Sequence, residues 1–95
     1  MNIKNISGTS DRKCACGSWL KHWENISRQA APTYCPVSSC INKDLVGAHV
    51  QKGDSPDGRW FIYPLCAAHN QTGQTLEVPD WYPLVSATRS ETCER

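Results

Sequence analysis

The sequence predicts a small α+β domain with one helix and a β-hairpin. The chain has 95 residues, which is the size of one domain and buries too little apolar surface for a large core. Residues 19–26 carry apolar side chains at helical spacing, and two β-prone segments, 44–50 and 59–63, are separated by a loop rich in turn formers. The expected organisation is a flexible N-terminal arm over 1–13, a single domain over 14–87 and a flexible C-terminus over 88–95.

Charge and hydropathy exclude several classes of protein. Ten basic and nine acidic residues give a formal net charge of +1, which provides no general attraction to nucleic acid or to acidic membranes. No stretch approaches the roughly 20 apolar residues that a membrane span needs, and the N-terminus lacks the apolar core of a secretory signal. We therefore expect a cytoplasmic protein without a membrane partner.

The predicted helix begins after Ser18, which is a favourable N-cap residue. Trp19, Trp23 and Ile26 recur at helical spacing, so we expect them to form one stripe that packs inward. Because indole rings bury large areas, this stripe is better explained as core than as a ligand platform.

The hairpin is expected to end at Pro64, because proline interrupts the hydrogen bonds of a strand. A short helix that carries Cys66 and His69 should follow, with Gly73 as its stop signal. A further strand over 75–78 and a short apolar segment over 84–87 complete the prediction.

Two pairs of potential metal ligands flank the predicted hairpin. Cys35 and Cys40 bracket a short turn, and Cys66 and His69 are three residues apart, which places them on one face of a helix. Three thiolates and one imidazole form the tetrahedral set that zinc prefers, so we predict a structural zinc ion at these four residues. A disulfide or a buried pair of free thiols is the alternative, since six cysteines are an even number.

A second group of potential ligands lies nearer the N-terminus. Cys14 and Cys16 are too close in sequence to bond each other without strain, and His22 follows on the predicted helix. These three residues would hold a second zinc ion or complete the first. Alternatively, the two thiols lie at a helix N-terminus, where the positive end of the dipole favours reactive thiolates. Cys93 is expected to be a free thiol.

A turn with two ligands, a hairpin and a helix with two further ligands is the order of a treble-clef zinc arrangement. On these motifs, residues 35–70 resemble the ββα-metal core of HNH endonucleases in its zinc-stabilised form. GAHV (47–50) lies where that family has its strand histidine, and PLCAAHN (64–70) lies where its helix begins. The resemblance implies an HNH-like ββα core, to which the helix predicted over 19–26 adds an N-terminal helix. It also implies that His69 replaces a helix cysteine as zinc ligand and that Asn70 occupies the position of the final metal-binding histidine.

The resemblance further implies an endonuclease in which His49 is the general base and Asn70 binds a second divalent metal. However, Ala48 stands where the family often has an acidic ligand, and aromatic side chains at 60–63 stand where its middle asparagine is expected. We therefore expect a non-catalytic HNH-like zinc-binding module, with a metal-dependent HNH-type DNA endonuclease as the alternative. A structural role for His49, or zinc ligation by it, also remains open.

The expected partner is a protein or a nucleic acid, and the low net charge favours a protein. Trp60, Trp81 and Tyr82 are the candidate contact residues, because a small domain has little room to bury four tryptophans. Lys43, Lys52 and Arg59 are the candidates for a local basic patch.

Overall fold

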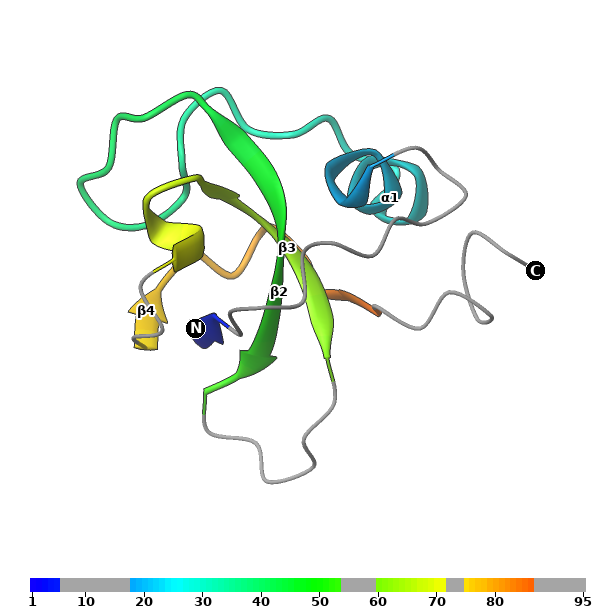
Figure 1. The fold of residues 1–95 in the computed structure, drawn as a ribbon. Helices are drawn as coiled ribbons and strands as arrows, with labels where there is room; N and C mark the ends of the chain where they lie inside the picture. The colour runs from blue at the N-terminus through cyan, green and yellow to red at the C-terminus, as the bar shows by residue number, and fades with distance from the viewer. Residues whose placement is uncertain (6–17, 54–59, 72–74, 87–95) are drawn as a thin grey trace.

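The computed structural model of the chain describes residues 1–5, 18–53, 60–71 and 75–86 (Figure 1). Within these residues it contains one α-helix, one short 3-10 helix and a five-stranded sheet, which confirms the α+β class. The elements in chain order are β1 (Asn2–Asn5), α1 (Trp19–Ser27), β2 (Leu45–Lys52), β3 (Phe61–Cys66), η1 (His69–Gln71), β4 (Thr75–Glu77) and β5 (Val85–Ser86). No helix in the described part of the chain has the length and hydrophobicity needed to cross a membrane.

The hairpin of β2 and β3 lies at the centre of the sheet, whose strand order is β4-β1-β2-β3-β5 with all neighbours antiparallel. Ala48 lies opposite Tyr63, and His49 lies opposite Ile62. Successive side chains of a strand point to opposite faces, so Ala48 and Tyr63 share one face while His49 and Ile62 share the other. In Figure 1, α1 lies on one side of this hairpin and the 34–44 loop lies on the other.

Local signals fix both ends of α1. The Ser18 hydroxyl accepts a hydrogen bond from the Lys21 amide at 3.1 Å, which confirms Ser18 as N-cap. At the other end Arg28 adopts a left-handed conformation with φ 61°, and its amide donates to the Glu24 carbonyl. A left-handed residue of this kind is a common helix terminator.

The helix packs against its face of the sheet through a smaller core. This core consists of Trp19, Trp23, Ile62 and Val85. Trp23 is fully buried, and its indole N–H donates to the Pro83 carbonyl at 2.8 Å. Ile26 was predicted to pack inward with Trp19 and Trp23, and this prediction is wrong, because its side chain is 40% exposed. The buried face of α1 contains His22 in its place.

The opposite face of the sheet carries the larger core, which also joins the sheet to the turn over residues 35–40, here called the cysteine turn. Its buried members are Ile3, Cys35, Ala48, Val50, Tyr63, Leu65, Cys66, Leu76 and Val78. Ile3 belongs to β1, which lies between β4 and β2 and pairs with both. The prediction of a flexible arm over 1–13 is therefore wrong for residues 2–5, because their backbone is paired on both sides. The rest of that arm, Gly73 and the C-terminus over 88–95 lie outside the described residues.

Pro64 does not end β3, contrary to the sequence-based expectation. The strand continues to Cys66, with Pro64 opposite Gly47. Among the described residues β5 pairs with Phe61 and Ile62 and not with Pro64, so Pro64 lies in a part of β3 that has β2 as its one neighbouring strand, an edge position where proline is tolerated. Cys66 therefore lies at the end of a strand and not on the expected helix. In the described part of the chain, the three-residue η1 stands where that helix was expected.

Candidate metal centre

The first two ligands lie on a tight turn that precedes β2. The Cys35 amide donates to the Asn42 carbonyl at 2.8 Å, and the Cys40 amide donates to the Val37 carbonyl at 3.0 Å. Ser39 adopts a left-handed backbone with φ 66°, which tightens the turn between the two cysteines. The Cys35 side chain is buried and that of Cys40 is half-buried. The turn thus brings both thiols to the same edge of the larger core.

The second two ligands come from the end of the hairpin. Cys66 is the last residue of β3, and His69 is the first residue of η1. The Ala67 amide donates to the Asp44 carbonyl at 3.2 Å, which holds the connecting turn against the start of β2. Cys66 Sγ and His69 Nδ1 are 3.2 Å apart. The predicted proximity of this pair is therefore confirmed, although a turn rather than a helix produces it.

The four donor atoms of Cys35, Cys40, Cys66 and His69 all lie within 4.8 Å of one another. The Cys40 and Cys66 sulfurs are 3.9 Å apart, and the Cys35 sulfur is 3.5 Å from His69 Nδ1. A tetrahedron with zinc–sulfur bonds of about 2.3 Å and zinc–nitrogen bonds of about 2.0 Å has sulfur–sulfur edges of about 3.8 Å and sulfur–nitrogen edges of about 3.5 Å. The Cys40–Cys66 and Cys35–His69 distances match these edges, whereas the 3.2 Å between Cys66 and His69 is shorter, and the four side chains together could hold a metal ion for which zinc is plausible.

These thiols do not form the disulfides considered as an alternative. Cys35, Cys40 and Cys66 are free, and the 3.9 Å between the Cys40 and Cys66 sulfurs far exceeds a covalent bond. The disulfide interpretation is thus wrong for these three cysteines. Cys14, Cys16 and Cys93 lie outside the described residues.

Hydrogen bonds favour the thiolate form of Cys66, which is the form of cysteine that binds a metal cation. Burial by itself raises the pKa of the Cys66 thiol, but hydrogen bonds from Asn42 and His69 outweigh it and lower that pKa to about 6. Burial raises the pKa of Cys35 to about 11, and hydrogen bonds from the backbone of Cys66 and Val37 offset part of this increase. A buried group of thiolates needs a compensating positive charge, which a divalent metal supplies while it deprotonates the remaining thiols. The chemistry of the donors therefore fits the same ion as their geometry.

His49 lies in the other core and is not a member of the four-residue cluster. Its ring centroid is 4.7 Å from that of Trp19 and 6.2 Å from that of Trp60, in edge-on contacts. The side chain is only 4% exposed, and its Nδ1 atom has no hydrogen-bond partner among the described residues. Burial, with a smaller contribution from His22, lowers the pKa of His49. The sequence-based option of zinc ligation by His49 is not supported by this placement.

Asn70 contacts a residue that the sequence did not single out. Asn5 donates through Nδ2 to the Asn70 side-chain oxygen at 2.9 Å and to the His49 carbonyl at 3.3 Å. Asn5 is buried, and its Oδ1 atom has no partner in the described part of the chain. Met1 and Ile3 alternate with the polar Asn2 and Lys4, but the polar Asn5 occupies the next inward-facing position, so the sequence carries only a weak signal for this strand.

His22, predicted as a ligand of a second zinc ion, belongs to α1 and is fully buried. Its Nε2 atom is 2.9 Å from the Ser86 carbonyl, and its ring centroid is 5.0 Å from that of Trp19. The structure thus gives His22 a role in joining α1 to β5. The second zinc site remains a prediction, because Cys14 and Cys16 lie outside the described residues.

Within the described residues, the Cys35, Cys40, Cys66 and His69 cluster is the only group of three or more potential ligands with the spacing of a metal site. Its donors come from the cysteine turn, the end of β3 and the start of η1, which are otherwise separate segments. Comparison with protein-family models, with curated proteins and with solved structures finds no match for this chain.

Proposed function

We propose that Cys35, Cys40, Cys66 and His69 bind one structural zinc ion, and that the chain is a non-catalytic module that binds another protein. The observation that carries the proposal is the fit of the four donor atoms to a zinc tetrahedron. Catalytic zinc sites keep one position open for water or substrate, whereas structural sites are filled by four protein ligands. A set of three cysteines and one histidine fills all four positions and leaves none for chemistry.

The order of ligands along the chain supports a treble-clef origin for this site. A turn with two cysteines precedes the β2–β3 hairpin, and the second ligand pair follows it, as in the zinc-stabilised HNH-like arrangement. The expected α-helix after the hairpin is reduced to η1 in the described residues. We therefore propose a divergent HNH-like scaffold that keeps the zinc ligands.

The placement of the two candidate catalytic residues favours a non-catalytic role. The His49 ring is packed edge-on against two indoles and is almost fully buried. The side-chain oxygen of Asn70 already accepts a hydrogen bond from Asn5. A general base needs access to a water molecule, which the burial of His49 restricts, and the hydrogen bond from Asn5 occupies one of the two lone pairs of the Asn70 oxygen.

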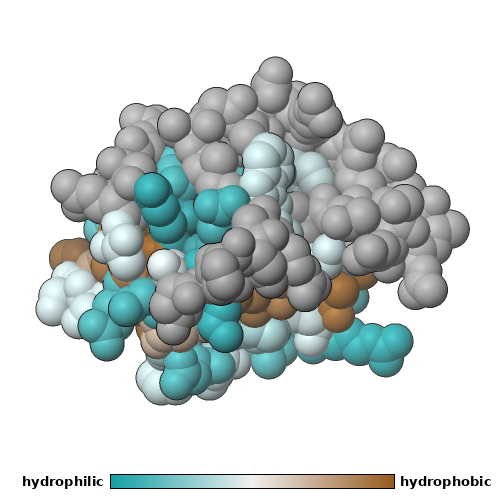
Figure 2. Space-filling view, turned by 90° about the horizontal axis from the view of Figure 1, so that it is seen from below, coloured by the Kyte–Doolittle hydropathy of each residue, from teal (hydrophilic) through white to brown (hydrophobic). Residues whose placement is uncertain are grey.

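Exposed aromatic and aliphatic side chains support a role in binding. Trp81 is 70% exposed and Trp60 is 45% exposed, as expected from the sequence, whereas Tyr82 is half-buried against both cores. Figure 2 shows hydrophobic areas separated by hydrophilic ones on the face that it presents. A net charge of +1 provides little neutralisation of phosphates, so a protein is the favoured partner.

Zinc titration tests the structural role of the site. Metal-free protein should gain its far-ultraviolet circular dichroism and a cooperative unfolding transition as zinc is added, because metal binding and folding are coupled in such sites. Cys66→Ser should fail to do so at the same zinc concentration, and Cys93→Ser, a matched substitution outside the cluster, should behave as the wild type. Equal folding of metal-free and zinc-loaded protein would overturn the proposal.

An HNH-type DNA endonuclease is the second candidate, and one observation favours it. Asn5 links the β2 backbone at His49 to Asn70, so both candidate residues belong to one hydrogen-bonded group. Incubation of zinc-loaded protein with supercoiled plasmid and Mg²⁺, Mn²⁺ or Ni²⁺ decides between the candidates. We expect no cleavage, whereas cleavage that His49→Ala abolishes would establish the nuclease.

A further inference from the structure

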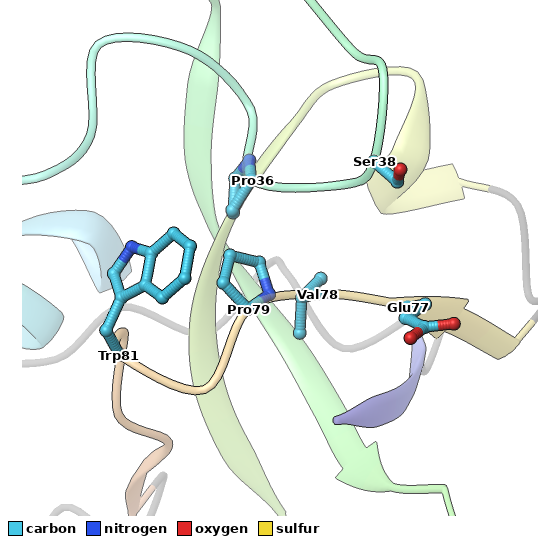
Figure 3. A pocket seen from close by; sticks show the side chains of 6 residues that line it. All are labelled: Pro36, Ser38, Glu77, Val78, Pro79 and Trp81. Carbon is cyan, nitrogen blue, oxygen red and sulfur yellow. The ribbon is translucent and has the colours of Figure 1, made fainter.

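A groove lies beside the metal centre, between the cysteine turn and the segment that follows β4. Its volume is about 430 Å³, and its lining residues are Pro36, Ser38, Glu77, Val78, Pro79 and Trp81. Figure 3 shows the Trp81 indole at one end, Glu77 at the other, and Val78 and Pro79 between them. Pro36 and Ser38 form the facing wall. The groove is therefore elongated, with an aromatic end and an acidic end.

Both walls of this groove are held in place by contacts outside it. In the first wall the Cys35 amide donates to the Asn42 carbonyl at 2.8 Å and the Cys40 amide donates to the Val37 carbonyl at 3.0 Å, which holds the turn that carries Pro36 and Ser38. In the second wall the Val78 amide donates to the Met1 carbonyl at 2.9 Å, and the Tyr63 hydroxyl donates to the Pro79 carbonyl at 3.3 Å. A preorganised surface loses little conformational entropy on binding, which favours recognition of a flexible peptide.

The aromatic end of the groove is suited to proline. Trp81 is 70% exposed, and the neighbouring Pro79 and Pro36 give this part of the groove an apolar, rigid lining. Extended proline-containing segments bind in grooves lined by aromatic side chains, because their polyproline II conformation is already formed before binding. An exposed tryptophan in such a groove is the type of residue that contributes most to binding.

The acidic end of the groove determines the charge of its ligand. Glu77 is exposed at this end, and none of the six lining residues is basic. Asp80, 84% exposed and beside Trp81 in the sequence, is paired with the Met1 amino group at 2.9 Å, so the acidic character of the groove comes from Glu77. A carboxylate that faces an open groove attracts a Lys or Arg side chain and disfavours an acidic one.

Building on the proposed role as a zinc-dependent binding module, we propose that this groove binds an extended, proline-containing peptide that carries a basic residue. A proline of the peptide stacks on Trp81, and its Lys or Arg pairs with Glu77. Because Pro36 and Ser38 lie on the turn between two zinc ligands, peptide binding depends on the metal centre.

Fluorescence anisotropy with labelled decapeptides tests this proposal. The probe is a set of polyproline peptides with one Arg near either end, and the control set has Glu in place of Arg. We expect saturable binding of an Arg peptide, at least tenfold tighter than that of its Glu counterpart. Trp81→Ala should weaken binding at least tenfold, and Glu77→Gln should remove the preference for Arg. Ile41→Ala, which truncates a residue that is 79% exposed and outside the groove, should change neither.

The zinc content of each sample separates the two proposals. Zinc-loaded wild-type protein that binds no peptide at millimolar concentration would overturn the groove assignment and leave the metal centre intact. Folded protein without zinc would overturn the metal centre, whatever the peptides do. Binding that Trp81→Ala leaves unchanged, or tighter binding of a 20-nucleotide single-stranded DNA that Trp81→Ala abolishes, would also overturn the peptide assignment.

Discussion

Replacement of Gly47 by alanine would insert a methyl group into the contact between β2 and α1. An ideal Cβ atom at this position would overlap the carbonyl carbon of Trp19 and the amide nitrogen of Leu20, and it would lie 2.6 Å from the Trp19 carbonyl oxygen. Ordinary contacts of a Cβ atom begin near 3.4 Å. All three neighbours are backbone atoms, so no side chain can rotate to make room. The first turn of α1 must therefore move by about 1 Å or more to restore ordinary contact distances.

This displacement should cost much of the stability of the domain. Overpacking of a core typically costs about 1–3 kcal/mol, and a clash with rigid backbone belongs at the upper end of that range. The buried Trp19 and Trp23 both depend on the same helix position. We therefore expect a loss of about 3 kcal/mol in the free energy of unfolding, which lowers the Tm of a domain of this size by roughly 12 °C or more.

Gly53 provides a matched control at the other end of β2. A Cβ atom there would lie 3.2 Å from the Asn2 Cβ and carbonyl oxygen, which is tight but can be relieved by a small shift. We expect Gly53→Ala to cost less than about 1 kcal/mol, since surface substitutions of this kind have small effects. Thermal unfolding followed by circular dichroism in excess zinc measures both variants. A Gly47→Ala variant as stable as Gly53→Ala would refute the described docking of α1.

Three further predictions concern the metal centre and the buried histidine. His69→Cys should retain one zinc ion at a site of four cysteines, whereas His69→Ala should weaken zinc binding at least tenfold in competition with a chromophoric chelator. Asn42→Ala, which removes a hydrogen bond to Cys66, should weaken zinc binding about tenfold in the same assay. Burial lowers the pKa of His49 below its ordinary value of 6.5, so as the pH falls the unfolded chain takes up a proton before the folded protein does. Protonation therefore stabilises the unfolded chain, and the domain loses stability as the pH falls below about 6.5. His49→Phe should therefore show a smaller decrease in Tm between pH 7.5 and 5.5 than the zinc-loaded wild type, and an equal decrease would contradict the buried neutral imidazole.

The cluster of three cysteines and one histidine was predictable because each of its two pairs is local in sequence. Cys35 and Cys40 bracket one turn, and Cys66 and His69 are three residues apart, so short-range geometry brings each pair together. The β-prone segments on either side of a turn-rich loop then predict the hairpin that joins the pairs. The N-cap at Ser18 is likewise a local signal, and the helix begins where it indicates.

The features that sequence reasoning missed depend on contacts between distant residues. Strand β1 has two asparagines, which are unfavourable in strands, and it is ordered by pairing with β2 and β4, both of them remote in sequence. Pro64 lies in the part of β3 that, among the described residues, pairs with β2 alone, which is an edge position where a strand tolerates proline. His22 is oriented toward the sheet by a carbonyl of Ser86, far along the chain. None of these partners is visible in the local pattern from which each element was predicted.

We propose above that one zinc ion holds the cysteine turn to the end of the hairpin. Metal analysis of the purified, folded chain by native mass spectrometry tests it most directly. We expect at least one zinc ion per chain. A chelator should remove this ion, and the cooperative unfolding transition should disappear with it. Cys66→Ser should lose the ion, whereas Cys93→Ser should keep it. A folded chain that contains no zinc, or that keeps its unfolding transition after complete removal of the metal, would contradict the account.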